Sequence, residues 1–213
     1  PTWVAAWMEQ LVTATHGESR YNIAPSQEVP VFVTGADGAT VRLMRWGLVP
    51  SWARDTKIAY ATINARVETV AEKPAFRGAW RARRRALVPA TGWYEWKAVG
   101  TLKQPYYVSA SDGNPQMLGA LWERWLDPQG AELHSCAIIT VPVRPELAAV
   151  HDRMPLVLAP AQWAGWLDPK LPQVPAVLEA AALPYTFTTV ARTVNSVRND
   201  GPELVRPLFG LAQ

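Results

Sequence analysis

The sequence predicts an α+β fold in which mostly antiparallel strands alternate with short helices. Nineteen prolines among 213 residues argue against long helices and favour short strands and turns. Short apolar runs bounded by Gly and Pro recur along most of the chain, while helical spacing is confined to brief segments. With 49% hydrophobic and 18% charged residues and no linker, residues 1–213 are expected to form one globular domain.

The N-terminal part predicts a helix followed by a hairpin. Trp3, Ala6, Trp7 and Leu11 have helical spacing, which predicts an amphipathic helix over the first dozen residues. A polar turn then leads into a hairpin, because a turn signal separates two strand-like runs. The turn, strand, hairpin turn, second strand and following loop are expected at residues 20–25, 29–34, 36–39, 40–46 and 47–52.

The remaining elements follow the same criteria. Residues 62–69 are expected to be extended and to run into a helix start, and helices are predicted at residues 75–85, 145–150 and 160–167. Strands are predicted where β-branched and aromatic residues cluster between turn residues. They cover residues 85–89, 92–97, 105–109, 117–122, 133–140, 156–158 and 185–190.

Charge and composition limit the possible functions. The net charge is only +3, but the pI near 9.2 permits an anionic partner. Five arginines lie within nine residues, where a solvated helix face and phosphate contact are equally acceptable interpretations. They are Arg77, Arg81, Arg83, Arg84 and Arg85.

Other patterns exclude whole classes of site. Cys136 is the single cysteine, which rules out an intrachain disulfide and fits a reducing compartment; it is expected to be a buried, inert thiol. There is no apolar run long enough to span a membrane, no signal peptide, no phosphate-binding glycine motif and no metal-ligand spacing. We therefore expect no cofactor, no metal and a cytoplasmic protein.

Residues 92–97 (GWYEWK) place one carboxylate among three aromatic rings. In a strand, Trp93 and Glu95 share one face while Tyr94 and Trp96 share the other. A Glu beside a Trp loses hydration, which raises its pKa and makes it a candidate proton donor or acceptor near neutral pH. On these six residues alone, the favoured interpretation is a rim carboxylate paired with Lys97 or a nearby arginine.

Six ordered blocks resemble the motifs of the SOS response-associated peptidase (SRAP) family. Most of the chain, from about Arg20 to Leu204, is covered by this resemblance. The blocks are residues 20–25 (RYNIAP), 46–52 (WGLVPSW), 63–69 (INARVET), 92–97 (GWYEWK), 151–158 (HDRMPLVL) and 194–204 (VNSVRNDGPEL). The resemblance implies a single SRAP-like domain of curved, barrel-like sheets.

The resemblance also implies a chemistry. Members of this family bind single-stranded DNA and trap abasic sites by condensing the amine and thiol of an N-terminal cysteine with the sugar aldehyde, which gives a thiazolidine crosslink. By motif, Asn64 would hold the N-terminus or the sugar, Glu95 would act as general acid and base, and His151 would shuttle the proton that opens the ring. A desolvated Glu and a His with a pKa near ~6.5 suit proton transfer at pH 7.

The N-terminus departs from this pattern. The family begins Met-Cys-Gly-Arg, whereas this sequence begins at Pro1. A fragment that lacks its first residues is the favoured interpretation, because the other site residues have little purpose without the nucleophile. The alternatives are a member without its nucleophile, which would be a non-covalent single-stranded DNA-binding module, and chemistry at the secondary amine of Pro1. A thiol peptidase that removes its own initiator Met is a further alternative.

Single strands are bound by a basic groove together with rings on which bases stack. We expect Trp46, Pro50 and Trp52 to supply apolar contacts and Arg66 to supply charge beside Asn64. Further expected DNA contacts are Asn22, Pro25 and Arg85. The expected partner is single-stranded DNA with abasic sites, bound by a monomer that would be nucleoid-associated in a bacterium.

Overall fold

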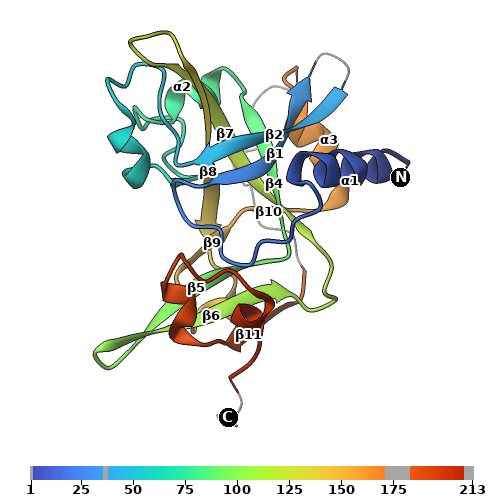
Figure 1. The fold of residues 1–213 in the computed structure, drawn as a ribbon, viewed down its shortest axis with the longest axis vertical. Coiled ribbons are helices and arrows are strands. Elements are labelled where there is room, and N and C mark those ends of the chain that lie inside the picture. The colour runs from blue at the N-terminus through green and yellow to red at the C-terminus, as the bar shows by residue number, and fades with distance from the viewer. Residues whose placement is uncertain (1, 36–37, 171–182, 209–213) are drawn as a thin grey trace.

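Five strands of the larger sheet close into a barrel. The computed structural model describes residues 2–35, 38–170 and 183–208. Around the barrel the strand order is β1, β2, β8, β7, β4 and back to β1, and all of these pairings except the parallel β2–β8 pair are antiparallel. Figure 1 shows this barrel in the upper part of the molecule. Its strands are β1 (Glu28–Gly35), β2 (Gly38–Trp46), β4 (Arg85–Ala90), β7 (Gln116–Leu126) and β8 (Glu132–Pro142).

Three short strands extend the barrel edges. β3 (Asn64–Arg66) pairs in parallel with β8, and β9 (Arg153–Pro155) pairs antiparallel with the same strand. Thr140 on β8 is paired with both Arg66 and Pro155, so β3 and β9 lie on its opposite edges. β10 (Val157–Leu158) adds to β7.

A second antiparallel sheet lies below the barrel in Figure 1. It has the order β11 (Tyr185–Thr189), β6 (Leu102–Ala110) and β5 (Gly92–Val99). Gly92 starts β5 where a Cβ atom would lie 2.4 Å from the carbonyl oxygen of Val108, so only glycine allows this close pairing. One cluster of buried apolar residues takes members from both sheets, among them Val108 and Tyr185 of the second.

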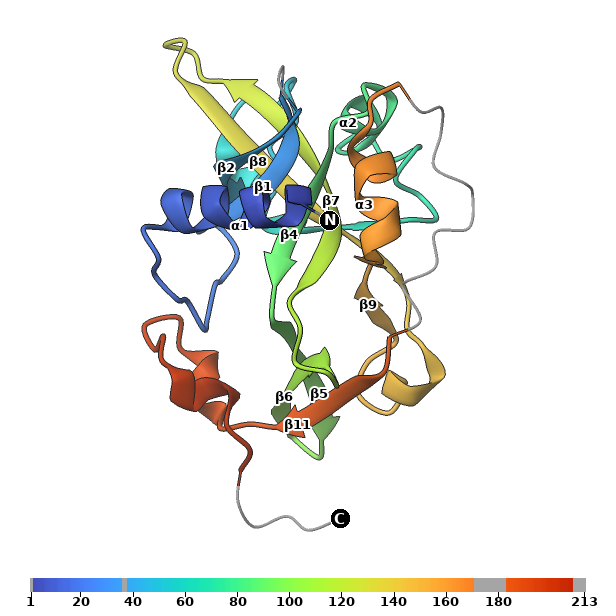
Figure 2. The same cartoon turned by 90° about the vertical axis from the view of Figure 1, so that its right-hand side faces the viewer.

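Helices cover the outside of the barrel. In α1 (Thr2–Thr15) the ring of Trp7 stacks on Phe32 of β1 and on Trp163 of α3 (Pro160–Leu167), with centroids 4.9 and 6.2 Å apart. Figure 2 shows α1 and α3 side by side with the barrel strands. The first and last predicted helices are therefore confirmed. The remaining short helices are η1 (Thr56–Ala61), α2 (Arg77–Arg81), η2 (Pro145–Leu147), η3 (Arg192–Asn195) and η4 (Pro202–Val205).

The arginine-rich helix is shorter than predicted. The sequence favoured residues 75–85, but Arg83 has φ +55°, a left-handed conformation that ends α2 and redirects the chain into β4. The predicted helix at residues 145–150 is likewise only the 3₁₀ turn η2. The hairpin turn expected at residues 36–39 lies partly outside the described residues.

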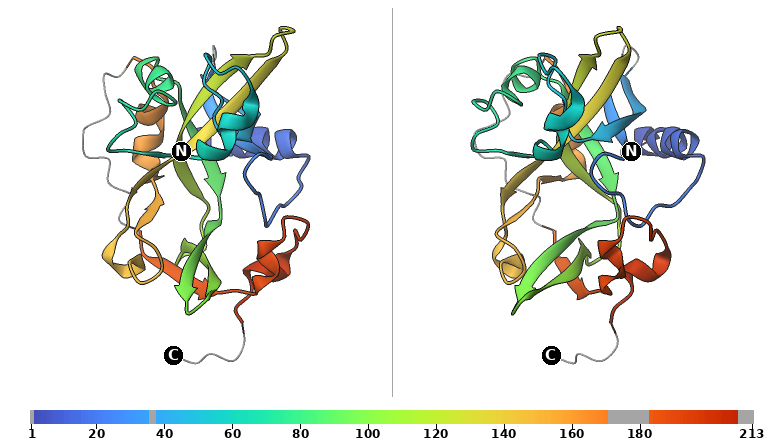
Figure 3. Two further views of the ribbon diagram at one scale, coloured as in Figure 1. Left: turned by 90° about the vertical axis from the view of Figure 1, so that its left-hand side faces the viewer. Right: turned by 60° about the vertical axis from the view of Figure 1, so that its left-hand side comes forward.

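The loop after α1 is fixed to the C-terminal segment. The buried side-chain amide of Asn22 donates to the carbonyl oxygens of Val194, Ser196 and Asn199 at 3.0–3.1 Å. Asp200 accepts from the backbone N–H of Asn22 at 2.9 Å. Figures 2 and 3 show this blue loop beside the red C-terminal segment. Within the described ranges, there is no helix of the length and apolarity required to cross a membrane.

Candidate functional site

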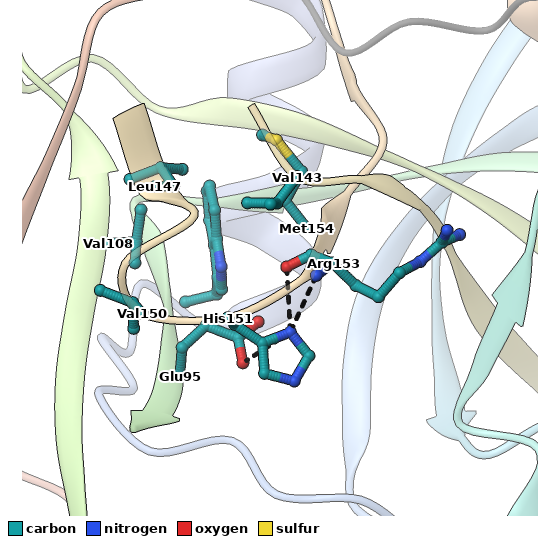
Figure 4. Close-up of a pocket in the computed structure, with 9 residues that line it drawn as sticks. Glu95, Val108, Val143, Leu147, Val150, His151, Arg153 and Met154 are labelled. Atoms are coloured by element: carbon teal, nitrogen blue, oxygen red, sulfur yellow. Dashed lines mark hydrogen bonds and ion pairs between the residues drawn. The ribbon is translucent and has the colours of Figure 1, made fainter. Parts of the chain in front are cut away.

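Glu95 lies in a small pocket between the second sheet and the segment after η2 (Figure 4). The empty space in and above this pocket, open solvent included, is about 180 Å³. As the alternation of β5 predicts, Trp93 and Glu95 both line it, while Tyr94 packs on the other face against Tyr107. The rest of the lining is mostly apolar and consists of Val108, Val143, Leu147, Val150, His151, Arg153 and Met154.

Burial controls the protonation of Glu95. The apolar walls strip water from its carboxyl group and raise the pKa to about 7, an effect that Asp152 reinforces and the nearby His151 opposes. The side chain of Glu95 is 20% exposed. The group therefore exchanges its proton near neutral pH, as its position beside Trp93 predicts. The buried indole N–H of Trp93 has no hydrogen-bond acceptor within the described part of the chain.

His151 faces Glu95 with its Nδ1 atom. This nitrogen lies 3.9 Å from Oε2 of Glu95 and 3.3 Å from Oδ1 of Asp152. It also accepts a 3.0 Å hydrogen bond from the backbone N–H of Arg153. In Figure 4 the other ring nitrogen lies on the far side of the ring from the Arg153 backbone. The structure thus brings together Glu95 and His151, which sequence analysis took from two separate blocks.

Arg153 and Glu68 form an ion pair beside this pocket, which the sequence does not predict. The Arg153 guanidinium donates to both carboxylate oxygens of Glu68, at 2.6 and 2.9 Å, and to the carbonyl oxygen of Thr140 at 2.6 Å. The bond with Arg153 lowers the pKa of Glu68. Both residues belong to the quoted motif blocks. Spacing alone could not indicate that the side chain of Arg153 on β9 spans β8 and contacts Glu68, just after β3.

β3 presents Asn64 and Arg66 at the protein surface. Both side chains are exposed, and that of Asn64 makes no hydrogen bond to any described residue. Trp46 supports this strand, because its indole N–H donates to the carbonyl oxygen of Ile63 at 2.9 Å. β3 is connected to the His151 segment through β8, which pairs with both β3 and β9.

The expected apolar DNA contacts differ in accessibility. Trp52 is 59% exposed, and its indole N–H donates to the carbonyl oxygen of Pro74 at 3.3 Å. Pro25 is also exposed, whereas Pro50 is buried and Trp46 is half-buried. Only Trp52 and Pro25 of these four offer a largely open surface for a base or sugar.

Two of the expected polar contacts have structural roles instead. Asn22 is 7% exposed and its amide is used by the three carbonyl groups of the C-terminal segment. Arg85 is 5% exposed, donates to the carbonyl oxygen of Asp168 and lies over the ring of Trp166. The expectation that either side chain contacts DNA is therefore corrected, because burial leaves neither one accessible to a phosphate.

Two of the other grouped arginines also bind groups of the protein. Arg83 donates to the carbonyl oxygens of Pro169 and Lys170, and Arg84 pairs with the buried Glu123. Arg77 and Arg81 are exposed. Arg83 is exposed as well, so three of the five arginines remain accessible to a phosphate: Arg77, Arg81 and Arg83.

Cys136 is enclosed by the barrel core. The thiol is fully buried on β8, and burial raises its pKa to about 12. It is the inert thiol that the sequence predicts. Among the residues that the structure describes, no group of three or more His, Cys, Asp and Glu side chains lies close enough to hold a metal ion.

Comparisons with known proteins agree with the arrangement of these blocks. The family model described as "SOS response associated peptidase (SRAP)" matches residues 3–197. The chain is 38% identical over 193 residues to the abasic site processing protein YoqW of Bacillus subtilis, covering 87% of this chain and 84% of that protein. It is 31% identical over 194 residues to the abasic site processing protein YedK of Escherichia coli, covering 89% and 85%.

A solved structure has the same fold. The crystal structure of a protein from Bacteroides thetaiotaomicron superposes with a TM-score of 0.73 at 28% identity, covering 86% of this chain and 82% of that one. The barrel, the second sheet and the residues between them are thus a known arrangement. Because the family model matches nearly the whole length and two relatives exceed 30% identity, the chain belongs to the SOS response-associated peptidase (SRAP) family.

Proposed function

We propose that this protein processes abasic sites in single-stranded DNA and traps them covalently. The observation that carries the proposal is the pairing of Glu95, whose pKa is about 7, with His151 at 3.9 Å in one pocket. The names of the relatives YoqW and YedK, which are abasic site processing proteins, support the same substrate.

The proposed reaction needs an amine, a thiol and a proton donor. An abasic sugar in its open form carries an aldehyde. The α-amine of an N-terminal cysteine adds to this aldehyde, the resulting hydroxyl leaves as water, and the thiol sulfur adds to the imine carbon to close a thiazolidine. The sum is one thiazolidine and one water. The resemblance to the family, rather than any residue of the printed sequence, supplies the cysteine.

Glu95 suits the proton transfers of this sequence. With a pKa of about 7, both forms of its carboxyl group are populated at neutral pH. The acid form protonates the departing hydroxyl, and the carboxylate accepts a proton from the adding amine. His151 forms a hydrogen bond with the sugar oxygen. The side chain of Asn64 is exposed and makes no hydrogen bond to any described residue, and it holds the sugar or the N-terminus.

DNA binding is proposed for the exposed residues around β3. Arg66 supplies positive charge beside Asn64, while Trp52 and Pro25 supply apolar surface. Stacking of one base on an aromatic ring is worth about 1–3 kcal/mol and does not depend on sequence. The protein would then bind single-stranded DNA through the phosphate backbone and the unpaired bases of the DNA.

Intact mass tests the proposal. The protein expressed from its full coding sequence is incubated with a single-stranded oligonucleotide that carries one abasic site. An adduct of protein plus oligonucleotide minus one water supports covalent trapping. Tight binding without an adduct would instead support a non-covalent DNA-binding module, and hydrolysis of added peptides would support a peptidase. A strand with an intact base at the same position is the control.

A further inference from the structure

We propose that Glu68 and Arg153 are positioning residues that hold neutral His151 in the tautomer protonated at Nε2, so that His151 acts as a hydrogen-bond donor to the substrate. The catalytic meaning of this inference rests on the proposed function. The tautomer itself is a property of the protein without DNA. Glu95, rather than His151, then carries the proton transfers of the reaction.

A hydrogen bond to the imidazole distinguishes its two nitrogens. A neutral imidazole has one N–H donor and one acceptor nitrogen. The backbone nitrogen of Arg153 lies 3.0 Å from Nδ1 of His151, and its N–H can donate to Nδ1 only when Nδ1 carries no proton. The single proton of the neutral ring then lies on Nε2, at the edge away from the Arg153 backbone (Figure 4).

Groups around Nδ1 oppose this tautomer. Oδ1 of Asp152 lies 3.3 Å from Nδ1, the carbonyl oxygen of Arg153 at 3.2 Å, and Oε2 of Glu95 at 3.9 Å. Each of these oxygens would accept a hydrogen bond from a protonated Nδ1. The tautomer is therefore decided by how firmly the backbone N–H of Arg153 is held against the ring.

The Arg153 side chain holds that backbone in place. It is only 15% exposed and forms a two-pronged pair with Glu68 as well as a bond to the carbonyl oxygen of Thr140. Arg153 is also paired with Pro142 in the β8–β9 ladder. A guanidinium fork matches a carboxylate in both direction and spacing, which a lysine cannot reproduce. Glu68 thus acts on His151 through Arg153.

The tautomer has a consequence for the reaction. If a protonated His151 gave its Nε2 proton to the substrate, the ring would be left with its proton on Nδ1, facing the N–H of Arg153. Two N–H groups would then point at one another. Keeping the Nε2 proton avoids this conflict, so His151 polarises a sugar oxygen through an Nε2–H hydrogen bond and the proton is exchanged by Glu95.

Imidazole ¹⁵N spectra of the full protein test the inference. Only three histidines are present, so the rings can be distinguished by substitution of His16 and His134. For the neutral ring of His151 we expect one form, with the proton on Nε2. A predominant Nδ1–H form, or an even mixture, would overturn the inference.

Glu68→Gln tests the positioning step, with Glu146→Gln as the matched control. Glu146 also pairs with an arginine, through a single 2.6 Å contact with Arg144 that lies outside the contacts of His151. In Glu68→Gln we expect mixed tautomers and a fall in the adduct rate on the order of tenfold, while Glu146→Gln changes neither. An unchanged tautomer in a folded Glu68→Gln protein would contradict the positioning role.

Arg153→Lys provides a second variant if Glu68→Gln does not fold. It keeps the charge but loses the fork, and the same tautomer mixture is expected. The two proposals fail separately. An Nε2–H tautomer without any DNA adduct would refute the proposed function alone, whereas an adduct formed by a protein with the Nδ1–H tautomer would refute the positioning role alone.

Discussion

Oε2 of Glu95 on β5 lies 3.9 Å from Nδ1 of His151, which belongs to the segment between η2 and β9. Glu95 comes from a strand of the second sheet and His151 from the segment that leads into β9 of the larger sheet, and they meet in a pocket with mostly apolar walls. Burial in this pocket gives this SRAP family member a carboxyl group with a pKa of about 7, beside an imidazole that acts to lower that pKa.

Glu95→Gln is expected to slow crosslinking strongly. General acid–base catalysis contributes about 10²–10⁴-fold, and the amide cannot exchange a proton. The measurement is the single-turnover rate of adduct formation with abasic single-stranded DNA, using protein whose N-terminus has been verified by mass. An unchanged rate would show that Glu95 has no part in proton transfer.

The same substitution should alter the dependence of stability on pH. The folded state raises the pKa of Glu95 from 4.5 to about 7, so between these values the unfolded chain loses the proton and the folded chain keeps it. The contribution of the neutral carboxyl to stability is present below pH 4.5 and is lost as the pH rises to 7. Relative to the native protein, Glu95→Gln should gain on the order of 2–3 kcal/mol over this interval. Urea unfolding at pH 4.5 and pH 8 gives the free energy of unfolding of the native protein and of Glu95→Gln. The same difference between the two proteins at both pH values would contradict the prediction.

Asn22→Ala should destabilise the fold without changing DNA contacts. The substitution leaves three carbonyl groups of the C-terminal segment without their donor, which is expected to cost about 2 kcal/mol or more. Denaturant unfolding measures the loss. Affinity for DNA should be retained by the folded variant at low temperature, and a selective loss of affinity would restore Asn22 as a DNA contact.

Trp52→Ala should weaken DNA binding and leave stability nearly unchanged. Its ring is 59% exposed, so truncation removes a stacking surface worth about 1–3 kcal/mol but little core packing. Fluorescence anisotropy with a labelled single strand gives the affinity. Trp96→Ala is a suitable control, because Trp96 lies on the face of β5 opposite Glu95. An equal loss of DNA affinity in both variants would argue against base stacking specifically on Trp52.

Arg66→Gln should reduce the salt dependence of binding. If Arg66 contacts one phosphate, the slope of log affinity against log salt falls by about 0.7 for a single strand. Titrations at several salt concentrations give this slope. A parallel line with the native slope would place Arg66 away from the backbone of the DNA.

Much of the fold could be predicted because the local patterns agree with the tertiary structure. The face that β5 gives to Trp93 and Glu95 follows from alternation alone, and α3 begins and ends at the predicted residues. Local patterns failed where a backbone conformation or a distant partner decided the outcome. The end of α2 depends on the left-handed Arg83, and no periodicity signals it.

The sequence proposes candidate site residues but not the geometry that brings Glu95 and His151 together. Motif order identified Asn64, Glu95 and His151, whereas the burial of Asn22 and Arg85 depends on segments far away in sequence. The contact between Glu68 and Arg153 could not be predicted either, because these residues are far apart in sequence. Their pairing exists because β8 brings β3 and β9 to its two edges.

The double pairing of Thr140 determines where the chain tolerates change. Arg66 and Pro155 are both paired with it, so β3 and β9 are two strand spacings apart, about 10 Å. A one-residue insertion in β8 near this point would shift the two strands relative to one another and separate Asn64 from the His151 segment, without touching either. Insertions in the β7–β8 hairpin, at the far end of the same strand, would leave this spacing intact. Protein engineers who attach a tag or a reporter to this fold should therefore choose that hairpin.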